Sequence, residues 1–130
     1  MRLDVQPALP IKIPHDRLTR FCLKYRVAKL SLFGSVLRED FTAESDIDFL
    51  VEFQAGYIPT FLVLAEMEEE LSEFLEGRRI DLRTPGELSP YFRDRVMAEA
   101  RVQYELKTTV VNIDRLRAEI DAIVAEIEHE

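Results

Sequence analysis

The sequence predicts an α+β fold: a small mixed β-sheet with flanking helices, followed by a heptad-patterned helix at the C-terminus. Short stretches of alternating apolar and polar residues are interleaved with longer stretches whose apolar residues recur every three or four positions. The 130 residues, 47% of them hydrophobic, suit one compact domain. Both observations favour a single sheet with helices packed on it.

The first third of the chain contains four predicted segments. Prolines at positions 7, 10 and 14 predict an extended arm over residues 1–14. Apolar residues at helical spacing predict an amphipathic helix over residues 15–25. Residues 29–33 alternate and stop at Gly34, which indicates a strand ended by a turn, and a short helix is expected over residues 35–38.

Residues 46–53 are the clearest strand in the sequence. Their odd positions are apolar, whereas their even positions include Asp46, Asp48 and Glu52. Because successive side chains of a strand point to opposite faces, one face belongs in the core and the other presents carboxylates.

A long helix is expected over residues 60–76, after the breaks at Gly56 and Pro59 and before Gly77. Its apolar residues recur at helical spacing and predict one buried stripe. The glutamates of this helix are expected to form a solvated face: Glu66, Glu68, Glu69, Glu70 and Glu73.

A third strand is expected over residues 79–83, followed by a turn over residues 84–86. Ser89 then resembles an N-cap with Pro90 at the first helical position, which predicts a helix that continues through Tyr104.

The C-terminal stretch follows a heptad pattern. Apolar residues, with one threonine among them, are spaced alternately by four and three positions: Val102, Leu106, Thr109, Ile113, Leu116, Ile120, Ile123 and Ile127. Two interpretations stay open. The helix folds back on its own domain, or it forms a seam with a second chain in a homo- or hetero-oligomer.

Charge is distributed unevenly along the chain. The formal net charge of −8 argues against a protein that coats nucleic acid, so no direct nucleic-acid binding is expected. Residues 1–38 carry a net charge of +6, whereas residues 39–76 carry twelve acids and no Lys or Arg. This asymmetry favours an anionic ligand near the basic block and a cation or a basic partner near the acidic block.

The sequence also excludes several classes of protein. No apolar run approaches the ~18 residues of a membrane span, and the N-terminus lacks the pattern of a secretory leader. The single cysteine, Cys22, cannot form an internal disulfide, and no Cys/His cluster could hold zinc. We therefore expect a soluble cytoplasmic protein with no membrane association.

The residues that suggest chemistry surround the second strand. Gly34 and Ser35 close the first strand, where glycine allows backbone amides to approach a phosphate and the serine hydroxyl can donate to it. Asp46 and Asp48 lie two apart on one strand, so their side chains point the same way, roughly 7 Å apart along the backbone. Such a pair favours Mg²⁺ bound together with substrate phosphates, and Asp81 on the next strand is the natural third carboxylate.

Gly34-Ser35, ten intervening residues and Asp46-Ile47-Asp48 resemble the signature of the nucleotidyltransferase superfamily related to DNA polymerase beta. More narrowly, the chain resembles the minimal nucleotidyltransferases, which include the antitoxins paired with HEPN-domain toxins. The resemblance covers about residues 15–105. It implies a nucleotidyltransferase domain over residues 15–107, with residues 108–130 as a helical extension.

The resemblance also implies an activity: Mg²⁺-dependent transfer of AMP from ATP to a tyrosine hydroxyl of a HEPN ribonuclease toxin, which is silenced by the modification. The implied catalytic residues, which would hold two Mg²⁺ ions, are Asp46, Asp48 and Asp81. The implied triphosphate ligands are Gly34 and Ser35. Arg38 falls where relatives often carry an arginine near phosphate, and a solvated helix charge is the competing interpretation.

Three other functions stay open on the sequence alone. The chain could be an antitoxin that neutralises by binding, without catalysis. It could be a small-molecule adenylyltransferase, although such enzymes usually need a second domain or a dimer to hold the acceptor. It could also be an assembly module that works through its C-terminal heptads.

Overall fold

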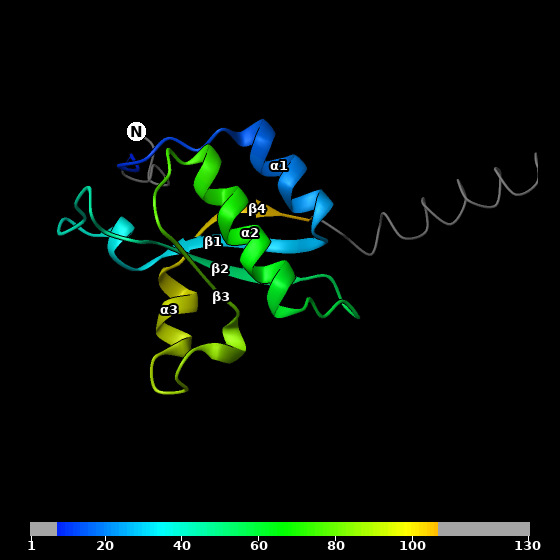
Figure 1. Cartoon of the computed structure of the whole chain (residues 1–130). Coiled ribbons are helices and arrows are strands. Elements are labelled where there is room, and N and C mark those ends of the chain that lie inside the picture. The colour runs from blue at the N-terminus through cyan, green and yellow to red at the C-terminus, as the bar shows by residue number, and fades with distance from the viewer. Residues whose placement is uncertain (1–7, 107–130) are drawn as a thin grey trace, which may run out of the picture.

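The computed structural model describes residues 8–106, which form a four-stranded sheet with strand order β3-β2-β1-β4 (Figure 1). Strands β1 and β2 are antiparallel, as are β1 and β4, whereas β2 and β3 are parallel, so the sheet is mixed. The elements follow one another as α1 (His15–Lys24), β1 (Val27–Phe33), the 3-10 turn η1 (Gly34–Leu37), β2 (Ile47–Phe53), α2 (Phe61–Phe74), β3 (Ile80–Arg83), the 3-10 turn η2 (Pro85–Glu87), α3 (Arg93–Glu99) and β4 (Arg101–Glu105).

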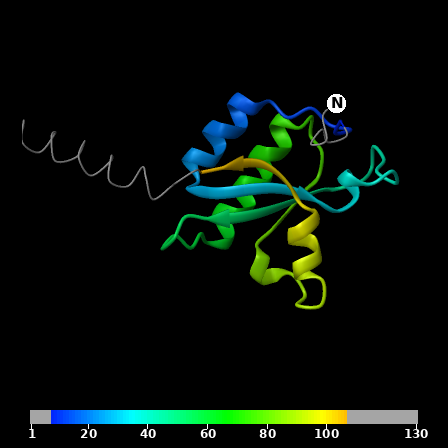
Figure 2. The same cartoon turned by 180° about the vertical axis from the view of Figure 1, so that it is seen from behind.

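The core lies between the sheet and the helices α1 and α2. Both helices cover the same face, and the reversed view shows the sheet in front of them (Figure 2). Leu30 pairs with Val51 and Leu32 pairs with Phe49 across β1 and β2, and all four side chains are buried. This is the apolar face that the alternation along β2 predicts.

The opposite face of the same strands carries the polar residues of the site. Phe33 pairs with Asp48, so both side chains point away from the face that holds Leu32 and Phe49. Helix α3 lies on this side, away from α1 and α2 (Figure 1). The sheet therefore separates the main core from the surface where chemistry is expected.

The predicted α+β fold is confirmed, and its elements up to β3 lie close to their expected bounds. The extended arm continues to Pro14 without helix or strand, and its apolar residues Leu9, Ile11 and Ile13 pack against the core. Helix α2 begins after Thr60, whose side-chain oxygen accepts a hydrogen bond from the Val63 amide at 3.3 Å. No helix among residues 8–106 is both long and apolar enough to cross a membrane.

The helix predicted from Ser89 through Tyr104 is wrong at both ends. Ser89 instead holds a turn, because its carbonyl accepts hydrogen bonds from the amides of Phe92 and Arg93, and α3 begins only at Arg93. After Ala100 the chain forms β4, which adds to the edge of β1. An unpaired edge strand leaves backbone groups without partners, and pairing with β4 satisfies them.

This strand also corrects the start of the predicted heptad helix. Val102 lies within β4 and pairs with Ser31, so it is not helical. Leu106 continues the pairing, since its amide donates to the Ala28 carbonyl at 2.7 Å. The remaining heptad positions lie outside the described residues.

Two glutamates of α2 are not part of a solvated face. Glu68 accepts a hydrogen bond from the Leu82 amide at 2.9 Å and so joins α2 to β3. Glu70 accepts hydrogen bonds from Lys24 at 2.9 Å and from the Tyr25 hydroxyl at 3.0 Å, which joins α2 to the end of α1. The acidic helix is therefore partly used to fix its neighbours in place.

Candidate active site

Two carboxylates lie side by side on the polar face, near the start of β2 and β3. Asp48 is the second residue of β2 and pairs with Asp81 in the parallel register of β2 and β3. Paired residues of neighbouring strands point to the same face, so the third carboxylate expected from the sequence lies on the same side of the sheet as Asp48.

The surroundings of Asp48 disfavour its charge. Burial raises the pKa of Asp48 from its ordinary value of 3.8 to about 6, and the nearby carboxylates of Asp81 and Asp46 add to the rise. Arg83 and Arg38 oppose the shift only in part. A half-buried carboxylate with two acidic neighbours is typical of a site that holds a cation.

Arginines at the two ends of β3 partner the other two carboxylates: Arg79 directly before the strand and Arg83 as its last residue. Asp46 lies one residue before β2, and its side chain forms an ion pair with Arg79 at 3.3 Å. Asp81 accepts a hydrogen bond from Arg83 at 2.9 Å. The arginines compensate these two charges, whereas Asp48 forms no such close ion pair within residues 8–106.

Gly34 brings the turn η1 against Asp48. Its φ is +78°, a conformation that favours glycine, and a Cβ atom at this position would collide with the Asp48 carboxylate. Ser35 follows in the same turn, and its carbonyl accepts a hydrogen bond from the Arg38 amide at 2.9 Å. The absence of a side chain at position 34 thus lets the turn and the carboxylate approach each other closely.

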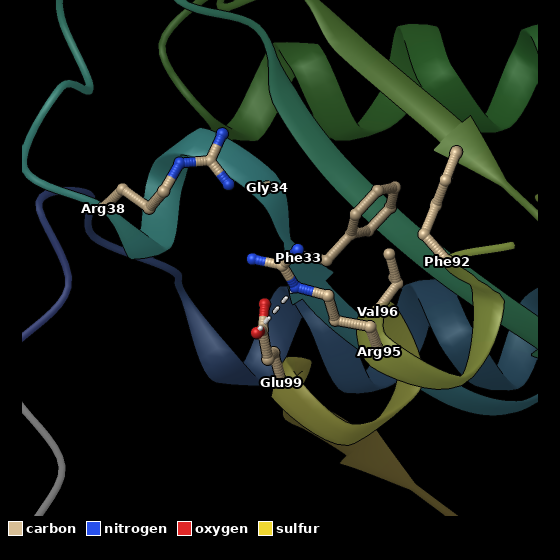
Figure 3. Close-up of a pocket in the computed structure, with 7 residues that line it drawn as sticks. All are labelled: Phe33, Gly34, Arg38, Phe92, Arg95, Val96 and Glu99. Atoms are coloured by element: carbon tan, nitrogen blue, oxygen red, sulfur yellow. Dashed lines mark hydrogen bonds and ion pairs between the residues drawn. The ribbon is translucent and has the colours of Figure 1, made fainter.

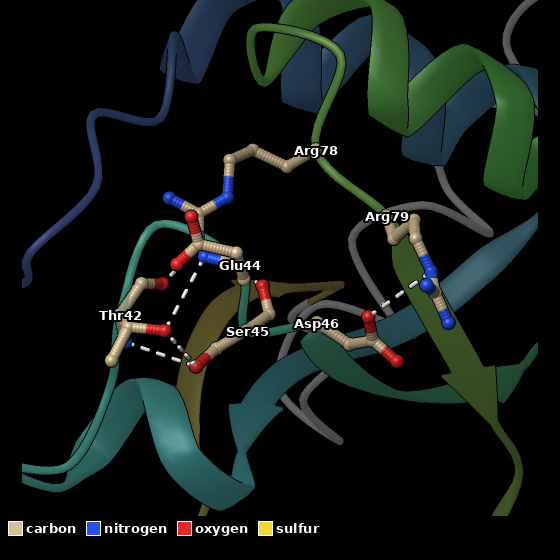
Figure 4. Close-up of polar contacts among 6 residues, drawn as sticks. All are labelled: Thr42, Glu44, Ser45, Asp46, Arg78 and Arg79. Atoms are coloured by element: carbon tan, nitrogen blue, oxygen red, sulfur yellow. Dashed lines mark hydrogen bonds and ion pairs between the residues drawn. The ribbon is translucent and has the colours of Figure 1, made fainter.

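The loop that leads into Asp46 is held by a residue that the sequence did not single out (Figure 4). Arg78 donates hydrogen bonds to the carbonyls of Thr42 at 2.9 Å and Ser45 at 3.0 Å, and its guanidinium lies over the Phe41 ring. Thr42 and Ser45 also contact each other through their hydroxyls, 3.2 Å apart. Arg78 therefore positions the residue directly before Asp46.

A hollow of about 310 Å³ opens beside Gly34, between η1 and α3 (Figure 3). Phe33, Gly34 and Arg38 line one side, and the residues on the other side come from α3 or its N-cap: Phe92, Arg95, Val96 and Glu99. None of these α3 residues was expected from the sequence to border the site, since the sequence placed them in a longer helix.

The carboxylates are not arranged as a closed metal cage. Among residues 8–106, no group of three or more Asp, Glu, His or Cys side chains is disposed to hold a metal ion as it stands. Asp46 and Asp81 are each engaged by an arginine, Arg79 and Arg83. The donors are nevertheless hard oxygen ligands, the kind that Mg²⁺ prefers.

The family model described as a nucleotidyltransferase domain matches residues 16–103, which include every residue of the site described above. The chain belongs to the nucleotidyltransferase domain family. It is therefore a nucleotidyltransferase, as the signature around Gly34 and Asp46 implied.

Relatives of this nucleotidyltransferase include protein adenylyltransferases. A candidate protein adenylyltransferase of Methanocaldococcus jannaschii is 40% identical over 78 residues, which cover 60% of this chain and 81% of the relative. The protein adenylyltransferase MntA of Thermococcus cleftensis is 36% identical over 76 residues, covering 58% and 74%.

Solved structures share the fold. One, of a candidate minimal nucleotidyltransferase, is 31% identical, with a TM-score of 0.55 over 66% of this chain and 85% of that chain. Another, of a tri-AMPylated HEPN toxin of Shewanella oneidensis in complex with an MNT antitoxin, is 18% identical, with a TM-score of 0.51 over 88% and 95%. At that identity the second likeness shows the fold alone.

Most residues singled out from the sequence come together on one face. Asp48, Asp81 and Gly34 are adjacent, Asp46 lies one residue before β2, and Arg38 borders the hollow. Their catalytic and binding roles stay predictions.

Proposed function

We propose that this chain is an adenylyltransferase antitoxin, which transfers AMP from ATP to a hydroxyl group of a HEPN-domain ribonuclease toxin. The observation that carries the proposal is the close approach of Gly34 to Asp48 where Asp48 pairs with Asp81. A phosphate-binding turn beside paired carboxylates brings a nucleotide and its counter-ions to one place. Membership of the family and the named protein adenylyltransferases among its relatives support the choice of reaction.

The residues present fit magnesium in their chemistry. Burial, the largest cause, and the neighbouring carboxylates of Asp81 and Asp46 raise the pKa of Asp48, and a divalent cation would offset the repulsion among these three carboxylates. The residues that would hold two Mg²⁺ ions are Asp46, Asp48 and Asp81. When bound, the metal supplies Lewis-acid stabilisation of the charge that develops on the phosphates and on the leaving pyrophosphate.

The chain's own residues then bind and orient the nucleotide. Backbone amides of the turn at Gly34 and Ser35, with the Ser35 hydroxyl, donate to the triphosphate, and Arg38 faces it from the end of the turn. In the transfer, the acceptor oxygen bonds to the α-phosphorus as the bond to pyrophosphate breaks. The acceptor's proton leaves toward Asp81, the carboxylate that we assign to the acceptor side.

Charge supports a basic partner. The twelve acids of residues 39–76 include Asp46 and Asp48 and are not balanced by any Lys or Arg within that stretch. A ribonuclease must carry positive charge to bind RNA, so its surface would complement this acidic block. The solved complex of an MNT antitoxin with an AMPylated HEPN toxin gives such a pairing a structural precedent.

The test is transfer to the partner encoded beside this chain. The purified protein is incubated with Mg²⁺, ATP labelled at the α-phosphate and a HEPN protein from the neighbouring reading frame. We expect label on the HEPN protein, and no label with Asp46→Asn or Asp48→Asn. The exposed Asp94→Asn on α3 is the matched control and should keep full transfer.

The alternatives predict different results. A non-catalytic antitoxin would inhibit the ribonuclease equally well with both aspartates replaced, and it would transfer no label. A small-molecule adenylyltransferase would leave the HEPN protein unlabelled while consuming ATP with a small hydroxyl acceptor. Either result would contradict the proposed function.

A further inference from the structure

The hollow beside Gly34 brings two arginines together from distant parts of the chain. Arg38 follows η1, and Arg95 lies in α3, more than fifty positions later in the sequence. Figure 3 shows both guanidinium groups directed toward the space beside Gly34. Gly34 also belongs to the proposed phosphate-binding turn, which lies directly against the Asp48 carboxylate. The hollow therefore adjoins that turn.

Both arginines are held only weakly. Arg95 pairs with Glu99 at 3.3 Å, and the two side chains are 79% and 61% exposed. Arg38 pairs with Asp40 at 3.5 Å, with 62% and 71% exposure. Exposed ion pairs of this kind contribute little to stability, so a phosphate can replace either carboxylate at little cost.

The hollow is also suited to an elongated anion. Its volume of about 310 Å³ lies within the range of small-ligand sites. Phe33, Phe92 and Val96 give it apolar walls, while the charged groups stand at its edge. A guanidinium group can bind phosphate oxygens through two parallel hydrogen bonds. Two arginines on opposite sides of the hollow could each bind a triphosphate in this way.

We propose that Arg95 is a nucleotide-binding residue, which exchanges Glu99 for the triphosphate and clamps it against Arg38 and the Gly34 turn. The inference rests on the proposed function, because it takes ATP as the substrate. Glu99 then acts as a competitor: its carboxylate occupies Arg95 until the nucleotide arrives.

The proposal predicts opposite effects for the two members of the pair. Arg95→Gln removes charge-assisted hydrogen bonds to phosphate and should raise the Kd of a non-hydrolysable ATP analogue roughly tenfold. Arg95→Lys should recover part of the affinity, because it keeps the charge but not the fork. Glu99→Gln releases Arg95 and should lower the Kd about threefold.

The binding is measured by calorimetry on the full chain with Mg²⁺ and the analogue, without any acceptor protein. Arg20→Gln is the matched control, since it removes an exposed arginine from α1 on the opposite face of the sheet. It should leave the Kd unchanged. In a transfer assay, Arg95→Gln should raise the KM for ATP and change kcat much less, a split that a purely structural role for Arg95 does not produce.

Equal Kd values for Arg95→Gln and Arg20→Gln would overturn the proposal, as would weaker binding by Glu99→Gln. These results are separable from failure of the proposed function. If the HEPN protein is not labelled but analogue binding depends on Arg95, the nucleotide site stands and the acceptor is wrong. If labelling proceeds and binding does not depend on Arg95, the acceptor stands and the present inference is wrong.

Discussion

Asp48 and Asp81 occupy paired positions on adjacent parallel strands, so two carboxylates lie side by side on one face of the sheet. Like charges opposite each other destabilise a strand pair. Asp46, two residues before Asp48, adds to the repulsion that Asp48 experiences. The arrangement therefore costs stability in the metal-free chain, and this cost can be measured.

The first prediction concerns the pH dependence of stability. The pKa of Asp48 is about 6 in the fold, against 3.8 for an ordinary aspartate. Between these values the folded chain retains a proton that the unfolded chain has lost, so the free energy of unfolding falls as the pH rises from about 4 to about 6. Asp48→Asn lacks this titration and should be more stable above pH 6, by about 1 kcal/mol after discounting for solvent screening of a half-buried group.

Urea denaturation of both proteins in EDTA, at pH 4 and at pH 7.5, checks this prediction. The difference should be much smaller at pH 4, where Asp48 is protonated in the folded chain and partly protonated in the unfolded chain. Asp94→Asn controls for the loss of one negative charge at an exposed position. A variant that is less stable than the parent at pH 7.5 would show that Asp48 is not under electrostatic repulsion.

The second prediction concerns Gly34. Its φ of +78° and the collision of a Cβ atom with the Asp48 carboxylate both oppose any side chain at this position. Gly34→Ala should therefore displace the turn or the carboxylate and reduce transfer roughly a hundredfold, the usual effect of misplacing a reacting group by about 1 Å.

Gly56→Ala separates the effect of backbone strain from the effect of the collision with Asp48. Gly56 has a similar φ of +83°, but a Cβ atom there meets no heavy atom within 4 Å. The Gly56→Ala variant should therefore lose about 1 kcal/mol of stability from backbone strain alone and keep its transfer rate. Equal loss of transfer in both variants would mean that the contact with Asp48 does not matter.

Local patterns in the sequence were sufficient for most of the fold. The alternation along β2 placed Phe49 in the core and Asp48 on the other face, and both predictions are confirmed. The spacing of apolar residues likewise located α1 and α2. These patterns reflect burial against a single neighbouring surface, which acts on each short segment directly.

The strand β4 was missed because two periodicities fit the same residues. Val102 and Tyr104 alternate with polar neighbours, as in a strand, but Val102 and Leu106 also stand at heptad spacing. The choice between them depends on the free edge of β1, which lies about seventy residues earlier in the sequence. Only a long-range contact decides it.

The same limit applies to the site. The motif around Gly34, Asp46 and Asp48 is local and could be found from spacing. Arg78 reaches the site from the loop between α2 and β3, and Arg95 reaches it from α3, through contacts that no sequence spacing encodes. Arginines are common on any protein surface, so their residue type alone gave no signal.

The third prediction concerns Arg78 as a positioning residue. Arg78→Gln removes two hydrogen bonds to the loop before Asp46 and the contact with the Phe41 ring. Transfer should fall at least roughly tenfold through looser placement of Asp46, while stability changes by only about 1 kcal/mol. Hydrogen exchange of the amides of Thr42 to Ser45 should become faster.

Two further variants test this role. Both hydrogen bonds come from one guanidinium nitrogen, Nη2. Arg78→Lys keeps the charge, but its side chain is shorter and lacks the planar group that lies over the Phe41 ring, so it should restore little of the activity. Arg17 also stacks over a phenylalanine, Phe74, but on the other side of the sheet, and Arg17→Gln should leave transfer unchanged. Full rescue by Arg78→Lys would mean that charge, and not the position of the loop, is what matters.

The fourth prediction concerns the outer edge of β3. The Leu82 amide points away from β2 and donates to Glu68 at 2.9 Å, and Leu82 is buried. Glu68→Ala leaves this amide without its partner, which should cost about 1–3 kcal/mol of stability. Glu69→Ala removes an exposed glutamate from the same helix and should cost little stability.

Because Leu82 follows Asp81 directly, Glu68→Ala should also slow transfer. Faster hydrogen exchange at the Leu82 amide would trace both losses to β3. If exchange at Leu82 is unchanged while stability falls, Glu68 stabilises α2 by itself and does not fix the strand that carries Asp81.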